Sequence, residues 1–475
     1  MQPYALNNIK IAYAILYGQI KKRGGLSMKK FLSLLLIVVL VLSLAACTKK
    51  APVDNATDTP NTGDTTEDVA SEGIEAEISV QVESDWLEYY EKVAERVKAN
   101  NPKAKINFIE TGSFDHLDVL DATDVTNKDV ADVFAIPADR IYGLSNNEAL
   151  AAIDAKTMAN NVGGFSNYDA GLGGNFNING EYLAFPMNIE TLINFANTAN
   201  AEASGIDLSK TIEFTELKNE DMLVPVFNAW FGVALTNAGN IEFLGKDDSG
   251  NLYSDLTKDF ADLTKEQQDV FTALFNYWKA HKSAGTSLWD KDAAWGYMDT
   301  EFSSGGKNSI RLEGPWSTGS LSALANDGKD LAILPINQVT VAGKPLAHWK
   351  GGWGLAINAR NEGDDNKMQL AMRFIEEVVN PEYAVDFFEA TGKILENVKV
   401  DEYLNSGLSD TDKVVIEAVM KSYEDAPARP LFTEWGSVWD TWQNAMLSWS
   451  SVNPGTVEEA YSLIKASFEA MMGNF

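Results

Sequence analysis

The chain contains a single cysteine, Cys47, and this residue closes a long apolar run near the amino terminus. Two lysines precede the run, which extends from Phe31 to Ala46, and Leu-Ala-Ala stands directly before the cysteine. A short basic segment, an apolar segment and small residues before Cys resemble the lipobox of bacterial lipoprotein signals. We therefore expect residues 28–46 to be a signal peptide that is removed, and Cys47 to receive a diacylglycerol through a thioether bond.

An uncleaved transmembrane anchor is the alternative interpretation of this run. The segment from Phe31 to Ala46 has 16 residues, whereas a spanning helix needs about 20, so the length favours a signal peptide. Such a signal does not need residues 1–27. We expect translation to start at Met28, which makes residues 1–27 an untranslated or dispensable extension.

Acylation of Cys47 constrains the fold, because no thiol is then left for a disulfide and the core must form by apolar burial alone. The whole chain has a formal net charge of −30. The first 46 residues hold six basic side chains and no acidic ones, so the mature chain would carry −36. A charge of this sign repels nucleic acid and anionic lipid, and we expect neither as a direct partner.

Residues 48–71 contain no aromatic residue and no Leu, Ile or Met. A segment of this composition cannot bury enough apolar surface to become ordered. We therefore expect residues 47–73 to be a lipidated cysteine followed by a disordered tether, with the folded part beginning at residue 74.

The folded part begins with a pattern typical of a β-α-β unit. Apolar residues alternate over 78–82, recur with helical spacing over 86–97 and alternate again over 106–108. A nearly continuous apolar run over 130–136 is suited to a buried parallel strand. These segments predict an α/β fold that starts with a parallel sheet.

Further helices are predicted later in the chain. Thr264 and Gln267 have the spacing of a capping box, which predicts a helix start at 264. A second helix is expected over about 366–380, where Pro381 stops it, and two more with apolar stripes over 438–449 and 457–468.

Motifs for catalysis or metal binding are absent from the sequence. The three histidines are scattered, and HExxH, CxxC, GxSxG and GxGxxG do not occur. We expect no metal, no cofactor and no enzymatic activity. Paired carboxylates of a surface glycoside hydrolase stay open as an alternative, because so many acidic residues are present.

Aromatic residues stand beside Gly and Pro at places where the chain is expected to turn. Trp316 follows Gly-Pro, Trp353 lies between glycines, and Trp435 precedes Gly436. An exposed ring at a segment end can stack on the C–H face of a sugar, while nearby polar groups bind the hydroxyls. The alternative is that these rings fill the packing between domains.

Several short motifs of this sequence follow one another in the same order as in a known protein family. The chain resembles, from about Ile74 to Phe475, the solute-binding lipoproteins of ABC importers, specifically the maltose- and maltodextrin-binding members of family 1. The motifs are Val130–Phe134 ahead of Asp139-Arg140, Leu183–Pro186 before Glu190, Leu312–Trp316, Gly351–Asn358, and Ala428-Arg429-Pro430 leading to Trp435.

The resemblance implies an α/β fold of two lobes, the type II hinge-closing fold, in which each lobe is assembled from discontinuous segments. Lobe 1 is expected to comprise residues 74–187 plus 348–406, and lobe 2 residues 188–347 plus 407–475. The hinge crossings are expected near 185–190, 347–352 and 405–410. A sugar would bind between the lobes and draw them together.

The resemblance also implies ligand-binding residues. Matched positions carry polar side chains for hydroxyls or aromatic side chains for stacking. Trp353 is added from its local context, and Asp85 with Trp86 from their place after the first strand. The full set expected to bind ligand is Asp85, Trp86, Asp139, Arg140, Glu190, Phe227, Trp230, Trp316, Trp353 and Trp435.

Four departures from the maltose-binding pattern indicate an altered cleft. Ile136 replaces a tryptophan, Pro225 a glutamate, Phe227 a tyrosine and Glu313 an asparagine. The expected protein is a monomeric receptor, held by lipid at the extracellular face of a Gram-positive-type cell membrane. It would deliver a di- or oligosaccharide to the transmembrane subunits of an ABC permease. A receptor of the same fold for a peptide, polyamine or other non-sugar solute is the alternative.

Overall fold

The structure is a computed structural model that describes residues 73–247 and 249–475. The predicted signal peptide, Cys47 and almost all of the predicted tether lie outside the described residues. Within the described ranges, no helix has both the length and the apolar composition needed to cross a membrane.

The larger sheet has six strands in the order β17-β6-β16-β3-β1-β2. Its strands are β1 (Glu77–Val82), β2 (Lys105–Glu110), β3 (Val133–Pro137), β6 (Phe185–Glu190), β16 (Gly351–Ile357) and β17 (Ile394–Leu395). β1 runs parallel to β2 and β3, whereas β16 is antiparallel to both β3 and β6. Every residue of β3, β6 and β16 is buried, as expected for central strands covered on both faces.

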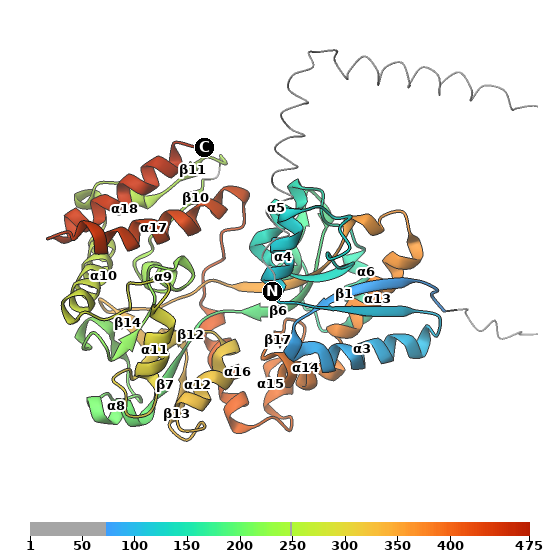
Figure 1. The fold of residues 1–475 in the computed structure, drawn as a ribbon, viewed down its shortest axis with the longest axis horizontal. Helices are drawn as coiled ribbons and strands as arrows, with labels where there is room; N and C mark the ends of the chain where they lie inside the picture. Colours follow the sequence, from blue (N-terminus) through green and yellow to red (C-terminus); the bar gives the residue numbers. More distant parts are fainter. Residues whose placement is uncertain (1–72, 248) are drawn as a thin grey trace, which may run out of the picture. The chain divides into compact units, whose positions relative to one another are not determined.

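Helices cover both faces of this sheet, and Figure 1 shows α3 and α14 on one side with α4 and α5 on the other. The helices are α3 (Leu87–Asn100), α4 (Ser113–Ala122), α5 (Ile141–Asn146), α6 (Ala155–Val162), α7 (Leu172–Asn175), α13 (Asp365–Val378), α14 (Ala384–Thr391) and α15 (Val400–Leu404). A small hairpin is formed by β4 (Asn177–Ile178) and β5 (Glu181–Tyr182). We call the sheet with these elements the first lobe.

A second sheet has four strands in the order β13-β7-β12-β9. Its strands are β7 (Ile193–Asn197), β9 (Met222–Leu223), β12 (Ile310–Glu313) and β13 (Leu331–Leu334). Three short strands pair nearby, namely β8 (Ile212–Glu213), β14 (Val339–Val341) and β15 (Lys344–Pro345), and β10 (Gly245–Lys246) pairs with β11 (Leu252–Tyr253).

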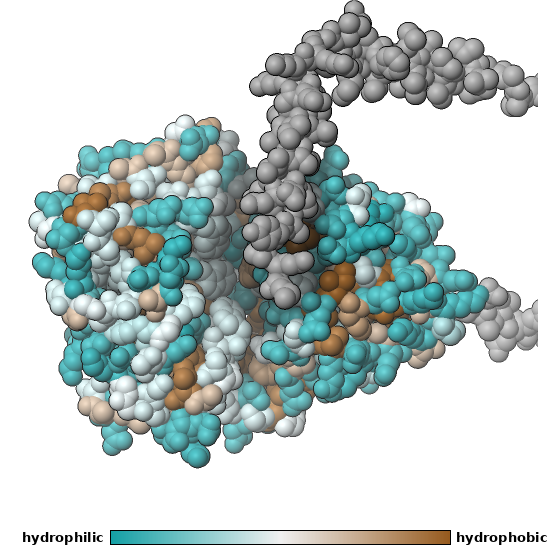
Figure 2. All heavy atoms as spheres, viewed as in Figure 1, coloured by the Kyte–Doolittle hydropathy of each residue, from teal (hydrophilic) through white to brown (hydrophobic). Residues whose placement is uncertain are grey.

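The helices of this second lobe include its longest elements and carry about half of its apolar core. They are α8 (Thr198–Ser204), α9 (Ala229–Thr236), α10 (Lys265–Ala284), α11 (Ala294–Phe302), α12 (Thr318–Leu324), α16 (Asp410–Glu424), α17 (Gly436–Val452) and α18 (Val457–Met472). α17 packs along α18, as Figure 1 also shows. Residues on the drawn face of both lobes are largely hydrophilic (Figure 2).

The two lobes share elements and core. β6 of the first sheet runs almost directly into β7 of the second, and α16 contacts both α15 and the strands β7 and β13. One hydrophobic cluster contains Val80 of β1, Phe195 of β7 and Ile416 of α16 together. The exact lobe boundaries given above stay a prediction.

Most elements expected from periodicity are confirmed, including the first β-α-β unit. The capping box at the start of α10 is present in both directions, from Thr264 and from Gln267. The strand expected over 130–136 is wrong at its start, because β3 begins at Val133. Asp132 ends the preceding segment instead, where its carboxylate accepts the backbone N–H of Ser79 at 2.8 Å.

Candidate functional site

The side chain of Arg429 lies at the centre of the best candidate site. Its segment follows α16 and is held beside the start of β16, where the N–H of Lys350 donates to the carbonyl of Pro427 at 2.8 Å. The Arg429 side chain is 5% exposed. A buried guanidinium needs specific partners, because it cannot be deprotonated in a protein.

Three tryptophan rings surround this guanidinium. Its Cζ atom lies 5.0 Å from the ring centroid of Trp230, 5.7 Å from that of Trp349 and 5.8 Å from that of Trp439. These distances are within the cation–π range of about 6 Å. We call Trp230, Trp349 and Trp439 the Arg429 cage, and all three pack in the hydrophobic cluster of the second lobe.

The fourth partner of Arg429 comes from the first lobe. Asp139 stands in a short 3₁₀ helix, η2 (Ala138–Arg140), directly after β3, and its Oδ2 lies 2.8 Å from Arg429 Nη2. This ion pair therefore joins the two lobes. A hydrogen bond from Asn146 to Thr433 at 3.4 Å joins them a second time.

Trp435 packs within this cluster and extends it. Its ring centroid lies 5.0 Å from that of Trp349 and 4.9 Å from that of Trp439, and the residue is 4% exposed. Two buried polar atoms of the cluster, Trp435 Nε1 and Asp139 Oδ1, have no hydrogen-bond partner among the described residues. Buried polar atoms normally have partners, so these two are exceptions within the cluster.

A second group of rings and charges lies next to this cluster, at the end of β6. Glu190 accepts the Nε1–H of Trp353 with both carboxylate oxygens, at 3.1 and 3.2 Å. The Nζ atom of Lys393 lies 5.1 Å from the Trp353 ring centroid and 5.3 Å from that of Trp86. Phe114, 58% exposed, contacts Trp353 edge-on at 5.2 Å.

The electrostatics link the two groups. Burial raises the pKa of Glu190, and the positive charges of Lys393 and Arg429 oppose this shift. An alanine side chain at Gly351 would lie 3.6 Å from the Trp230 ring and 3.0 Å from the Glu190 carbonyl, so the groups are adjacent. Burial lowers the pKa of His348 to about 3, and the neutral ring packs on Trp230 at 4.3 Å.

The structure therefore brings together six of the ten predicted residues. Trp86, Asp139, Glu190, Trp230, Trp353 and Trp435 belong to this connected set of rings and charges, which we call the lobe junction, together with Trp349, Trp439, Lys393 and Arg429. The other four predicted residues, which are not part of the lobe junction, are Asp85, Arg140, Phe227 and Trp316.

Two of these four lie at its edge. Asp85 is exposed and precedes Trp86 in the chain. Trp316 is 44% exposed and folds back over Gly314. Its neighbour Pro315 reaches the first lobe, since a Cβ atom at Gly392 would lie 3.8 Å from the Pro315 carbonyl oxygen.

The other two make contacts elsewhere. Arg140 forms an ion pair with Asp121. Phe227 is 3% exposed and stacks on Trp295 at 6.1 Å. Nothing in these contacts brings either side chain to the lobe junction.

The expectation that Trp353 stands in a turn is wrong. It lies inside β16 and is 6% exposed. The glycines beside it are needed for close packing rather than for turning, because a Cβ atom at Gly352 would lie 2.3 Å from Leu172 Cδ1 and one at Gly354 2.6 Å from the Phe176 ring.

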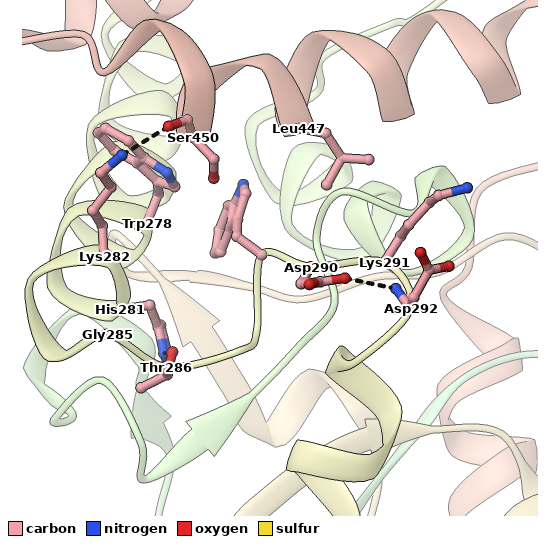
Figure 3. Close-up of a pocket in the computed structure, with 11 residues that line it drawn as sticks. Trp278, His281, Lys282, Gly285, Thr286, Asp290, Lys291, Asp292, Leu447 and Ser450 are labelled. Atoms are coloured by element: carbon pink, nitrogen blue, oxygen red, sulfur yellow. Dashed lines mark hydrogen bonds between the residues drawn. The ribbon is translucent and has the colours of Figure 1, made fainter.

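A separate surface pocket of about 600 Å³ lies between α10 and α17 of the second lobe (Figure 3). It contains none of the residues of the lobe junction. Its polar groups largely bind one another, since Lys282 donates to the Ser450 carbonyl at 2.8 Å and both nitrogens of His281 have partners at 2.8 Å. No cluster of three or more His, Cys, Asp or Glu suited to a metal ion occurs in the described ranges.

Comparison with known families decides what kind of protein carries this site. The model of the family described as bacterial extracellular solute-binding protein matches residues 80–401, which is more than half of the chain. The chain belongs to this family. No curated protein matches this solute-binding protein significantly.

Solved structures with the same two-lobe α/β fold include three receptors. The maltose-binding protein MalE of Listeria monocytogenes, solved with maltose, is 18% identical and has a TM-score of 0.62, over 84% of this chain and 99% of that one. MalX of Streptococcus pneumoniae, solved with maltopentaose, has the same identity and TM-score over 83% and 99%. The GacH receptor of Streptomyces glaucescens, solved with acarbose, is 14% identical with a TM-score of 0.64 over 84% and 99%.

Sequence reasoning missed four residues of the solute-binding protein's lobe junction as site residues. Arg429 was part of a motif, but its burial between rings depends on α9, β16 and α17 meeting. Trp439 stands four residues after Trp435, a helical spacing that places both on one face. Trp349 lies within a predicted hinge crossing, whereas no sequence signal indicates Lys393.

Proposed function

We propose that this protein is a lipid-anchored extracellular receptor that binds a di- or oligosaccharide between its two lobes and delivers it to an ABC permease. The observation that carries the proposal is the lobe junction itself. It places several tryptophan rings, two acids and two bases where the lobes meet, which is the combination of flat apolar surfaces and directed polar groups that sugars require.

The contacts across the lobe junction support binding coupled to lobe motion. Asp139 and Arg429 hold the lobes together through one buried ion pair. Separation of the lobes breaks this pair and exposes the Arg429 cage and Trp435. Asp139 Oδ1 and Trp435 Nε1 would then bind sugar hydroxyls, and a ligand that contacts both lobes favours their closed arrangement.

The comparisons support the ligand class and the compartment. The family is extracellular by its description, and MalE, MalX and GacH were solved with maltose, maltopentaose and acarbose. Anchoring through Cys47, which lies outside the described residues, rests on the lipobox-like segment. It predicts that Cys47→Ser releases the protein from the membrane fraction into the medium.

Ligand-dependent thermal melting of the purified protein tests the proposal. The panel contains mono-, di- and oligosaccharides, amino acids, dipeptides and polyamines. A ligand at 100 times its dissociation constant stabilises the folded state by about 2.7 kcal/mol, so a bound sugar raises the melting temperature. A response to a peptide or polyamine alone contradicts the sugar assignment, and steady release of reducing sugar contradicts the receptor.

Trp316→Ala locates the binding site. The side chain is 44% exposed at the edge of the lobe junction, so its removal should weaken sugar binding by about 1–3 kcal/mol with little change in melting temperature. Trp295→Ala is the matched control, since Trp295 is 42% exposed and stacks on Phe227 instead. Equal losses of affinity in both variants would contradict a site at the lobe junction.

A further inference from the structure

Lys393 occupies a defined position beside the rings of Trp86 and Trp353. It follows Gly392, which ends α14 with a φ of 65°, and it precedes β17. β17 pairs antiparallel with β6, so that Ile394 stands opposite Ile189. One residue further along this register, Lys393 faces Glu190.

The ammonium group of Lys393 forms no ion pair with any residue that the structure describes. Its ring contacts are Trp86 at 5.3 Å and Trp353 at 5.1 Å. By contrast, Arg429 has its carboxylate partner in Asp139 at 2.8 Å. In a chain with 38 basic and 68 acidic residues, a half-buried lysine left without a carboxylate partner at the place where the lobes meet calls for a functional explanation.

We propose that the ligand of this receptor is an acidic oligosaccharide, whose uronate carboxylate binds Lys393 Nζ beside the rings of Trp86 and Trp353. This inference rests on the proposed function and specifies the ligand class of the same site. It also makes Lys393 a specificity-determining residue, which separates an acidic sugar from a neutral sugar of the same shape.

The charges around Lys393 support a ligand with one negative charge. Arg429 and Asp139 compensate each other. Glu190 lies opposite Lys393; burial raises its pKa, the charge of Lys393 opposes this shift, and both of its oxygens accept the Nε1–H of Trp353. No hydrogen bond among the described residues uses Lys393 Nζ, so one carboxylate of a sugar acid can bind it. A charge-assisted hydrogen bond of this kind is short and strong in a site that excludes water.

The net charge of the protein predicts that salt changes the association rate of an anionic ligand but not that of a neutral one. With a formal charge of −36 on the mature chain, the distant field repels an anion, and salt screens this repulsion. The association rate of an acidic oligosaccharide should therefore rise between 20 and 200 mM salt, about doubling or more. The rate for a neutral oligosaccharide should not change.

The test compares each acidic oligosaccharide with its own methyl ester, which has the same sugar skeleton without the charge. The probes are trisaccharides of galacturonate, mannuronate and guluronate, their methyl esters, and neutral maltotriose. Calorimetry measures their affinity for the parent protein, for Lys393→Met, for Lys393→Arg and for Lys92→Met. Lys92 pairs with Glu88 on exposed α3, so Lys92→Met is a matched control for loss of one positive charge.

The expected result is that one acid binds and its ester binds more weakly. Lys393→Met should lower affinity for the acid about 10- to 100-fold, the range for a hydrogen bond to a charged group, and leave the ester within threefold. Lys393→Arg should restore most of the binding, and Lys92→Met should have no effect.

Each other outcome contradicts the inference, the proposed function or both. If neutral trisaccharides bind and no acid does, the acidic ligand class is wrong while the proposed function stands. If Lys393→Met weakens acid and ester equally, Lys393 does not read the charge and the inference fails. If no saccharide binds, both the inference and the proposed function are wrong.

Discussion

At the scale of single residues, Glu396 makes stability depend on pH. Burial raises the pKa of this carboxyl from 4.5 to about 7, although its Oε1 accepts the Leu172 N–H at 2.5 Å. The folded state therefore binds a proton that the unfolded chain has already lost between pH 4.5 and 7. Stability falls as pH rises through this window, by about 3 kcal/mol for a shift of this size.

Glu396→Gln should remove this dependence, because the amide stays neutral and keeps an oxygen for the Leu172 N–H. We expect the variant and the parent to have similar free energies of unfolding at pH 4.5, and the variant to be more stable at pH 8. Urea denaturation at both pH values measures this difference. Glu389→Gln, on the exposed face of α14, is the control, and an equal gain there would contradict the assignment to Glu396.

Single residues were predicted well where a motif marks them and poorly where only folding brings them together. Asp139, Glu190 and Trp435 were expected from motifs that occur in a known order, and the structure places them in the lobe junction. Arg429 lies in a loop after α16 and Lys393 in a turn before β17, and most of their partners are distant in sequence. Local sequence patterns do not indicate which distant segments come into contact.

At the scale of elements, β16 depends on glycine at position 352. A Cβ atom at Gly352 would lie 2.3 Å from Leu172 Cδ1 and 2.6 Å from the Asn188 carbonyl oxygen, and the latter is backbone that cannot rotate away. Gly352→Ala should therefore destabilise the fold by about 1–3 kcal/mol. Thermal or urea denaturation measures the change.

Gly319→Ala in α12 is the matched control for this substitution. A Cβ atom there meets no atom within 4 Å, and alanine is preferred to glycine in a helix by about 0.5–1 kcal/mol. The same change of side chain should thus stabilise one element and destabilise the other. Equal effects at both positions would show that steric contact at Gly352 is not the cause.

Periodicity predicted the bounds of helices and strands to within a few residues, but not which elements pack against one another. The apolar stripe of α17 and the capping box of α10 were visible in the sequence. The place of β16 between β3 and β6 was not visible, since its partners lie more than 150 residues earlier. The double glycine was interpreted as a turn for the same reason, because close packing against Leu172 and Phe176 has no local signal.

At the scale of the whole molecule, the shared core predicts a single unfolding transition. Val80, Phe195 and Ile416 belong to one hydrophobic cluster although they come from β1, β7 and α16, and the buried Asp139–Arg429 pair also joins the lobes. We expect calorimetry to give one peak whose calorimetric and van't Hoff enthalpies agree. Two resolved peaks would mean that the lobes unfold independently.

The place of β16 also determines when the protein can fold during its synthesis. β3 and β6 have been made by residue 190, but the strand that pairs with both is not complete until residue 357. Until then two inner strands of the first sheet have unpaired edges, which are open to wrong pairing. A chain that is exported during its synthesis would therefore cross the membrane before β16 can complete the first sheet. Folding of the first lobe would then follow transport.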